Sequence, residues 1–440
     1  MKGKLAKKVI SELPKFIKYP IYRTKLNLPS EIPPELQFKL ISSKEELIKS
    51  CRILHDCYVE MKYMKEDQYG LRLTPYHLLP STLTAVALWE GQVIATMSVV
   101  RDNPMGLPMD KVYDLSPLRK NGKVLGEVSG LAIDPKFRGS KGGLFHHLIR
   151  FLWNYSKTWH GLDYYVIAVN PSMSDFYEAF YLFEPMVLGH VVDGYDFANG
   201  ATAVALKMPI QTSYEIINSV YKNKPDTQNL YNFMTKPKLP CEIIPQKEYY
   251  TITDNYLNQF TFKDIYNTVN DFDSRFDDKT KKIFSTVYGF KSFEDLVEGK
   301  KASRLRHETR ALSLLVSDKS EEKKMTVASV KDISRNGLKV VVDGHVNESC
   351  SLTVAIGPNK KSNIIAEPIW VNPTGEVGMK IISSDNSWKS MHNAIDQKIL
   401  STLPESMKKL SNELKLSTEE NTNHVKDHDE SHSKIKNKAA

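Results

Sequence analysis

A strand, a glycine-rich basic loop and an amphipathic helix follow one another between residues 124 and 155. This order constrains the fold more than any other feature of the chain. The strand-like run Val124–Ile133 stops at Asp134-Pro135, and the loop 136–143 reads Lys-Phe-Arg-Gly-Ser-Lys-Gly-Gly. The helix that follows has an apolar face made of Leu144, Leu148, Phe151, Leu152 and Tyr155. Because the free N–H groups at a helix N-terminus attract an anion, the unit predicts an α/β domain with a phosphate-binding loop.

Further strand signals extend this α/β domain over residues 31–210. The runs Leu83–Trp89 and Val93–Val100 alternate around Glu90-Gly91, which predicts a β-hairpin with glycine in its turn. Asp163–Val169 predicts another strand, and it ends at an Asn-Pro pair that is typical of a turn.

The rest of the chain predicts two more structural classes. Residues 211–300 contain few strand runs and several helix-like segments, so we expect a helical connector there. Residues 301–395 contain short alternating runs, which predict a small antiparallel β-barrel. These runs are Leu312–Val316, Thr326–Val330, Leu338–Val342 and Leu352–Ile356. Residues 396–440 predict the continuation of a helix that begins near Ala394, followed by a polar tail from Ser417 that we expect to be disordered.

Composition narrows the classes of partner. The 440 residues carry a net charge of +8, which favours an anionic partner, but no nucleic-acid-binding module is recognisable. The four cysteines form no close pair of the kind that binds metal, and no secretory segment is visible, so we expect a cytoplasmic protein without a metal. No apolar run reaches the length of about 20 residues that a membrane-spanning helix needs.

The segment 1–30 has the pattern of a basic amphipathic helix. Apolar residues share one helical face and lysines flank it, which is typical of a helix lying on an anionic membrane surface. Pro14 and the alternative that this face packs against the domain both oppose that interpretation. The apolar residues are Leu5, Val9, Leu13, Phe16 and Ile17.

Several tracts of the α/β domain resemble known families. Gly126–Ile133 and Asn170–Tyr177, with the order of the elements around them, resemble the GNAT acyltransferase superfamily. Within it, Tyr76–Thr82, Gly106–Asp110 and Asn199–Ala201 are similar to the N-acyl amino acid synthases. The resemblance covers about residues 38–210. It implies an enzyme that transfers a fatty acyl group from a thioester to the amino group of an amino acid.

The resemblance also implies roles for individual residues. Glu127 matches the position of the general base, and Tyr177 matches the position that protonates the departing sulfur. A backbone N–H near Leu131 would stabilise the oxyanion. The alternatives are purely structural: Glu127 is a solvated strand residue, and Tyr177 is a core aromatic. The residues implied to bind the acyl donor are Leu131, Ile133, Arg138, Lys141, Gly142 and Gly143.

One departure from the GNAT pattern bears on the donor. Counted from Arg138, the usual loop requires glycine at position 141, where this chain has Lys141. An altered pyrophosphate cradle favours acyl carrier protein, whose phosphopantetheine carries a single phosphate, over acyl-CoA as the donor.

The barrel region contains two further motifs. Arg306 and Arg310 stand four residues apart, and Asp332, Ser334 and Gly337 follow in the string Asp-Ile-Ser-Arg-Asn-Gly. Arginine can bind phosphate with two N–H groups and can stack on a purine ring, whereas lysine can do neither. The pair of motifs resembles the PilZ family, whose members bind the bacterial second messenger cyclic di-GMP through these residues. Alone, the first could be an ordinary charged helix and the second an ordinary turn.

The sequence therefore predicts a bacterial signalling enzyme, an N-acyltransferase regulated by cyclic di-GMP. Acyl carrier protein and an amino acid are its expected partners, and the inner face of an anionic cytoplasmic membrane is a further candidate partner. Two alternatives remain. One is a synthase of another acylated signal of the acyl-homoserine lactone type, and the other is a non-catalytic cyclic di-GMP effector.

Overall fold

The computed structural model describes most of the chain. The described residues are 10–29, 31–139, 143–187, 191–195, 197, 199–245, 247–251, 256–269, 275–298, 307–309, 312–317, 325–342, 346, 348–372 and 375–401. By its internal contacts the chain divides into two compact units, Met1–Lys389 and Ser390–Ala440. The α/β domain, the helical region and the barrel all belong to the first unit, so the finer five-part division remains a proposal.

The α/β domain contains a sheet in the order β6-β8-β5-β4-β3-β2-β1-β9, with β7 paired to β8. Neighbouring strands are antiparallel from β1 to β4, whereas β4 and β5 are parallel. The strands are β1 Leu36–Leu40, β2 Leu83–Trp89, β3 Gln92–Arg101, β4 Leu125–Ile133, β5 Tyr164–Val169, β6 Glu184–Pro185, β7 Val192–Tyr195, β8 Ala201–Pro209 and β9 Glu242–Ile243.

The predicted hairpin is confirmed, because β2 and β3 pair across the turn Glu90-Gly91, where both residues have positive φ. Strand β2 is buried on both faces. Ala85 and Ala87 belong to one core, and Val86 and Leu88 belong to the other, as the period of two along a strand requires.

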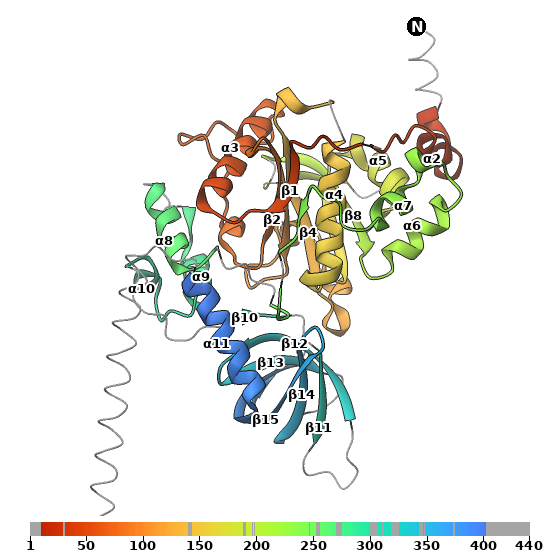
Figure 1. The fold of residues 1–440 in the computed structure, drawn as a ribbon. Helices are drawn as coiled ribbons and strands as arrows, with labels where there is room; N and C mark the ends of the chain where they lie inside the picture. The colour runs from red at the N-terminus through yellow and green to blue at the C-terminus, as the bar shows by residue number, and fades with distance from the viewer. Residues whose placement is uncertain are drawn as a thin grey trace, which may run out of the picture. The chain divides into compact units, whose positions relative to one another are not determined.

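Helices cover both faces of this sheet (Figure 1). Helix α4 (Leu144–Tyr155) packs on β1–β3, and α3 (Lys44–Glu60) packs on β3 and β4 from the opposite face. Ser43 begins α3 by accepting a hydrogen bond from the backbone N–H of Glu46 at 3.3 Å. Helix α5 (Pro171–Tyr181) follows β5 and packs on β8 and on α2 (Lys15–Arg23).

The middle of the chain is helical, as predicted. Apart from the short strand β9, the elements described in this region are helices. Phe262 of α8, Phe284 of α9 and Phe293 of α10 pack together in the same core as Val86. The helices are α6 Ser213–Tyr221, α7 Leu230–Thr235, α8 Gln259–Thr268, α9 Asp278–Val287 and α10 Phe293–Glu298.

The predicted antiparallel barrel is confirmed. Its strands pair in the order β12-β11-β14-β15-β16-β13, and β13 pairs again with β12, which closes the ring. Residues of β14 alternate between buried and partly exposed, as an interior and an exterior face require. The strands are β10 His307–Glu308, which pairs with β12 at one edge, β11 Leu312–Ser317, β12 Met325–Ser334, β13 Gly337–Val342, β14 Cys350–Gly357, β15 Lys360–Val371 and β16 Glu376–Ser384.

The two chain ends are described only in part. Helix α11 (Asn386–Ser401) includes the first part of the helix expected near Ala394, whereas the expected disordered tail lies outside the described residues. Of the predicted amphipathic face, Leu5 and Val9 also lie outside them. No helix in the described ranges is long and apolar enough to cross a bilayer.

Candidate active site

The candidate site lies where two strands of the large sheet separate. The parallel pairing of β4 with β5 joins Leu125–Glu127 to Tyr164–Val166 and goes no further. Just beyond Glu127, β4 has a bulge: Gly130 and Leu131 stand opposite the single residue Met97 of β3, and Gly130 has a positive φ of 64°. Glycine adopts this conformation without steric cost.

A cavity of about 170 Å³ fills the gap between the separated strands. Glu127 and Tyr177, the predicted base and acid, both line it, as does Leu131. Most of the remaining wall is apolar, with side chains from α4, from β5 and from the segment that follows α5. Those side chains include Phe145, Ile149, Leu152, Ile167, Val169 and Phe183. The sequence therefore identified two polar groups that the fold brings to one apolar cavity.

Glu127 is buried, with 1% of its surface exposed. Its Oε2 accepts a hydrogen bond from the Met109 backbone N–H at 2.8 Å, and its Oε1 accepts one from the Tyr195 hydroxyl at 3.0 Å. Burial raises the pKa of Glu127 to about 7; the nearby Asp110 carboxylate adds to the rise, while the two hydrogen bonds oppose it. The alternative that Glu127 is a solvated strand residue is therefore wrong. The strand pattern alone gives no information about which other segment of the chain covers the residue.

Tyr177 lies on α5, which Asn170 begins by accepting a hydrogen bond from the Ser172 backbone N–H. Its ring packs edge-on against Phe145 and Phe183. Its hydroxyl makes no hydrogen bond within the described part of the chain. Burial raises the pKa of this hydroxyl to about 12, so it stays protonated at neutral pH. Tyr177 therefore packs as a core aromatic and also lines the cavity, and its role as the acid remains a prediction.

The predicted donor-binding residues are only partly placed. Gly143 is the N-cap of α4 with φ of 59°, whereas Lys141 and Gly142 lie outside the described residues. Arg138 is exposed, and its guanidinium donates to Glu60 at 2.6 and 3.0 Å and to the Ile133 carbonyl at 3.0 Å. An anionic donor would therefore have to compete with Glu60 for Arg138.

The predicted cyclic di-GMP residues are also divided. Asp332 and Ser334 lie at the end of β12 and Gly337 begins β13, across a two-residue turn. Ser334 Oγ donates to the Gly337 carbonyl at 3.2 Å, so the hydroxyl helps to close the turn. Arg306 and Arg310 both lie outside the described residues.

Sequence reasoning missed the groups that hold Glu127. Tyr195 is 68 residues away from Glu127 in the chain, and no local sequence pattern predicts their contact. Met109 belongs to the tract Gly106–Asp110, which carried the family resemblance without an assigned role. Pro108 begins a 3-10 turn there (η2, Pro108–Lys111), and the Asp110 carboxylate accepts from the Leu107 backbone N–H at 2.7 Å. That turn sequence is the signal from which a fixed backbone donor could have been anticipated.

Arg72 is a second missed residue. Its guanidinium lies 4.3 Å from the centre of the Tyr58 ring and 4.9 Å from that of Phe197, and both rings line the cavity. It donates to the Phe197 carbonyl, and no carboxylate among the described residues pairs with it. A guanidinium this close to an apolar cavity makes the adjacent cavity wall favourable for an anion.

Among the described residues, no group of histidine, cysteine or acidic side chains is arranged to hold a metal ion. The four cysteines form no disulfide.

Comparison with known proteins agrees with the class of enzyme expected from the sequence. Residues 49–209 match the family described as N-acyl amino acid synthase FeeM. The match lies in the α/β domain and does not extend to the barrel. The predicted class, a GNAT-type N-acyltransferase similar to the N-acyl amino acid synthases, is thereby confirmed for this domain. No curated protein matches the chain.

Three solved structures are similar to part of the chain. FeeM, an N-acyl amino acid synthase from uncultured soil microbes, is 23% identical, and the alignment covers 41% of this chain and 93% of FeeM with a TM-score of 0.36. BjaI, a CoA-dependent acyl-homoserine lactone synthase, is 15% identical over 48% of this chain and 95% of its own, with a TM-score of 0.35. The acyl-homoserine lactone synthase LasI is 18% identical over 40% and 92%, with a TM-score of 0.30.

Proposed function

We propose that this chain transfers a fatty acyl group from a carrier thioester to the amino group of an amino acid, and that cyclic di-GMP bound to the barrel regulates the transfer. The proposal of acyl transfer rests on the environment of Glu127. It is a buried carboxyl with a pKa of about 7, and it lines the same apolar cavity as Tyr177. A base with a pKa near the working pH is the most effective proton acceptor.

In the proposed reaction, Glu127 removes one proton from the protonated amine of the amino acid. The free amine then attacks the thioester carbonyl, so that a C–N bond forms and the carbonyl oxygen becomes an oxyanion. Backbone N–H groups near Leu131 would stabilise this oxyanion, because β4 is no longer paired with β5 beyond Glu127. When the carbonyl re-forms, the C–S bond breaks. Tyr177 gives its proton to the departing sulfur and recovers one from the nitrogen, which leaves an amide and a free thiol.

The substrates follow from the cavity and its surroundings. The apolar wall suits an acyl chain, and the charge of Arg72 behind Tyr58 and Phe197 favours the carboxylate of an amino acid. The donor we favour is acyl carrier protein, because Lys141 replaces the glycine of the usual loop. The proposed acyl-donor residues are Leu131, Ile133, Arg138, Lys141, Gly142 and Gly143.

The experiment that tests the reaction is mass spectrometry of lipid extracts from bacteria that express the chain or its Glu127→Gln variant. We expect an N-acyl amino acid that is present with the wild type and absent with the variant. An N-acyl product that carries a lactone ring in place of the free carboxylate of an amino acid would favour an acyl-homoserine lactone type of synthase instead. Equal extracts from the wild type, the variant and an empty vector would contradict an acyltransferase function and favour a non-catalytic effector.

The regulatory part of the proposal has one structural support beyond the PilZ resemblance. Lys331, the neighbour of Asp332 on β12, donates from Nζ to the Gly122 carbonyl of the α/β domain at 2.9 Å. Burial lowers the pKa of Lys331 to about 8. A ligand held by Asp332, Ser334 and Gly337 together with Arg306 and Arg310 would therefore act next to a contact with the enzyme domain.

Calorimetry tests the ligand. We expect cyclic di-GMP to bind the wild type with micromolar or tighter affinity, and we expect Arg306→Ala and Arg310→Ala to abolish binding because each removes charge-assisted phosphate contacts. No heat of binding with the wild type would remove cyclic di-GMP from the proposal and leave the acyltransferase unaffected.

A further inference from the structure

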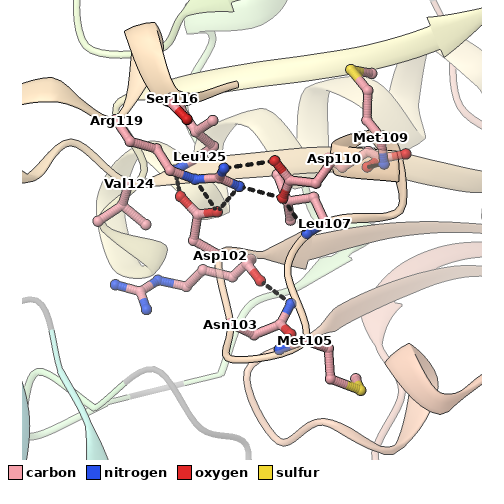
Figure 2. Close-up of polar contacts among 12 residues, drawn as sticks. Asp102, Asn103, Met105, Leu107, Met109, Asp110, Ser116, Arg119, Val124 and Leu125 are labelled. Carbon is pink, nitrogen blue, oxygen red and sulfur yellow. Dashed lines mark hydrogen bonds and ion pairs between the residues drawn. The ribbon is translucent and has the colours of Figure 1, made fainter. Parts of the chain in front are cut away.

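Arg119 is held between two carboxylates, those of Asp102 and Asp110 (Figure 2). Its Nε and Nη2 donate to Asp102 Oδ1 at 2.9 and 2.6 Å, and its Nη1 and Nη2 donate to the two Asp110 oxygens at 2.6 and 2.7 Å. The Arg119 side chain is 29% exposed, and those of Asp102 and Asp110 are 20% and 25% exposed. Bidentate pairing of this kind fixes geometry as well as charge.

Each carboxylate also accepts a backbone hydrogen bond. Asp102 Oδ2 accepts from the Leu125 N–H at 2.8 Å, and Asp110 Oδ2 accepts from the Leu107 N–H at 2.7 Å (Figure 2). Asp102 directly follows β3, Leu125 begins β4, and Asp110 lies in the turn η2. One guanidinium therefore joins the end of β3, the start of β4 and η2.

Two of these three segments hold the base. Met109, the neighbour of Asp110 in η2, donates its N–H to Glu127, and Glu127 lies on β4 two residues after Leu125. We infer that Arg119 is a positioning residue for the acyl transfer: it fixes the Met109 donor against the Glu127 acceptor and neutralises the Asp110 carboxylate beside them. This inference rests on the proposed function, because it assigns Glu127 as the base.

The charges around Glu127 predict opposite effects of two substitutions on its titration. The titratable groups that face Glu127 are the Asp110 carboxylate and the hydroxyls of Tyr195 and Tyr76. Of these, Asp110 is the carboxylate that pairs with Arg119, and its charge raises the pKa of Glu127. Loss of Arg119 would leave that charge uncompensated, whereas loss of the Asp110 charge would relieve it. The two substitutions should therefore move the titration of the base in opposite directions.

The test is the pH profile of kcat/KM for acyl transfer by the full chain. With Arg119→Gln we expect the acidic limb to move to higher pH, and with Asp110→Asn to lower pH, each by about 0.5 to 1 pH unit, the usual size of one such charge effect. Asparagine keeps an oxygen that can accept from Leu107, so the turn should survive. The double variant Arg119→Gln/Asp110→Asn should return the limb toward that of the wild type, and Arg119→Lys should shift it less than Arg119→Gln.

The matched control is Arg275→Gln. Arg275 pairs with Asp67 at 2.9 Å and its side chain is 22% exposed, so this variant loses an ion pair of similar exposure elsewhere. We expect no shift of the limb from it. Shifts of the same sign in Arg119→Gln and Asp110→Asn, or no shift in either, would overturn the inference. If the wild type turns over no thioester, the proposed function itself fails, and that outcome is distinct from an active enzyme with an unshifted profile.

Discussion

Glu127→Gln should stabilise the α/β domain at high pH while it slows catalysis. Burial raises the pKa of Glu127 from 4.5 to about 7 in the folded protein. At about 1.4 kcal/mol per pH unit, this difference corresponds to about 3 kcal/mol. Glu127 is almost completely buried, so solvent does not screen the effect.

The sign follows from proton binding. Below pH 4.5 the folded and unfolded states both hold the proton, and the carboxyl costs the folded state nothing. Between pH 4.5 and about 7 the unfolded chain releases its proton while the folded protein retains it, so stability falls as pH rises. Glutamine has no such proton. The variant should therefore gain roughly 2 to 3 kcal/mol over the wild type between pH 5 and pH 8.

The assay is urea unfolding at pH 5 and pH 8, read by hydrogen exchange of peptides from β4 and α4. Reading these peptides reports the α/β domain rather than the barrel. Glu184→Gln, which changes an exposed glutamate of the same domain, serves as the control and should show no pH-dependent gain. If Glu127→Gln gains as little as this control, Glu127 titrates as an ordinary carboxyl, and the reasoning from its burial is refuted.

Four further outcomes are expected. Tyr177→Phe should lower kcat about 100-fold or more with little change in donor binding, because it removes only the acid; an unchanged kcat excludes that role. Arg72→Gln should raise KM for the amino acid at least tenfold more than Arg72→Lys, which keeps the charge, and equal KM values would remove Arg72 from recognition. Lys331→Met should retain cyclic di-GMP binding but lose its effect on turnover, and a wild-type response would exclude the contact with Gly122 as the route. Serine at both Phe16 and Ile17, which are 78% and 40% exposed on α2, should weaken sedimentation with anionic vesicles, and unchanged sedimentation would exclude α2 from membrane contact.

The predicted membrane segment shows how tertiary contacts change a local pattern. The pattern predicts that its lysines face anionic lipid, but Lys15 pairs with Glu178 at 2.5 Å and Lys18 pairs with Asp175 at 2.8 Å on α5. A helical pattern gives the positions of charges on one element and not the charges on its neighbour. Any membrane contact of α2 would therefore depend mainly on Phe16 and Ile17.

The elements of the α/β domain could be predicted because their signals are local. The turn Glu90-Gly91, the apolar face of α4 and the end of β5 at Asn170-Pro171 each depend on residues close together in the chain. The placement of Glu127 and Tyr177 came from the family resemblance, and the structure adds that they share one cavity. The turn at Pro108 signals a fixed backbone donor, but its pairing with Glu127 and the hydrogen bond from Tyr195 could not be predicted, since they depend on how distant segments meet.

The most direct test of the account is turnover by the purified chain of an acyl carrier protein thioester with a free amino acid. Thiol release and the mass of the N-acyl product are measured together, for the wild type and for Glu127→Gln. The account predicts a product with one thiol released for each amide formed, an acidic limb of kcat/KM near pH 7, and a rate lowered about 100- to 10,000-fold in the variant. Equal rates in the two proteins, or thiol release without amide, would contradict it.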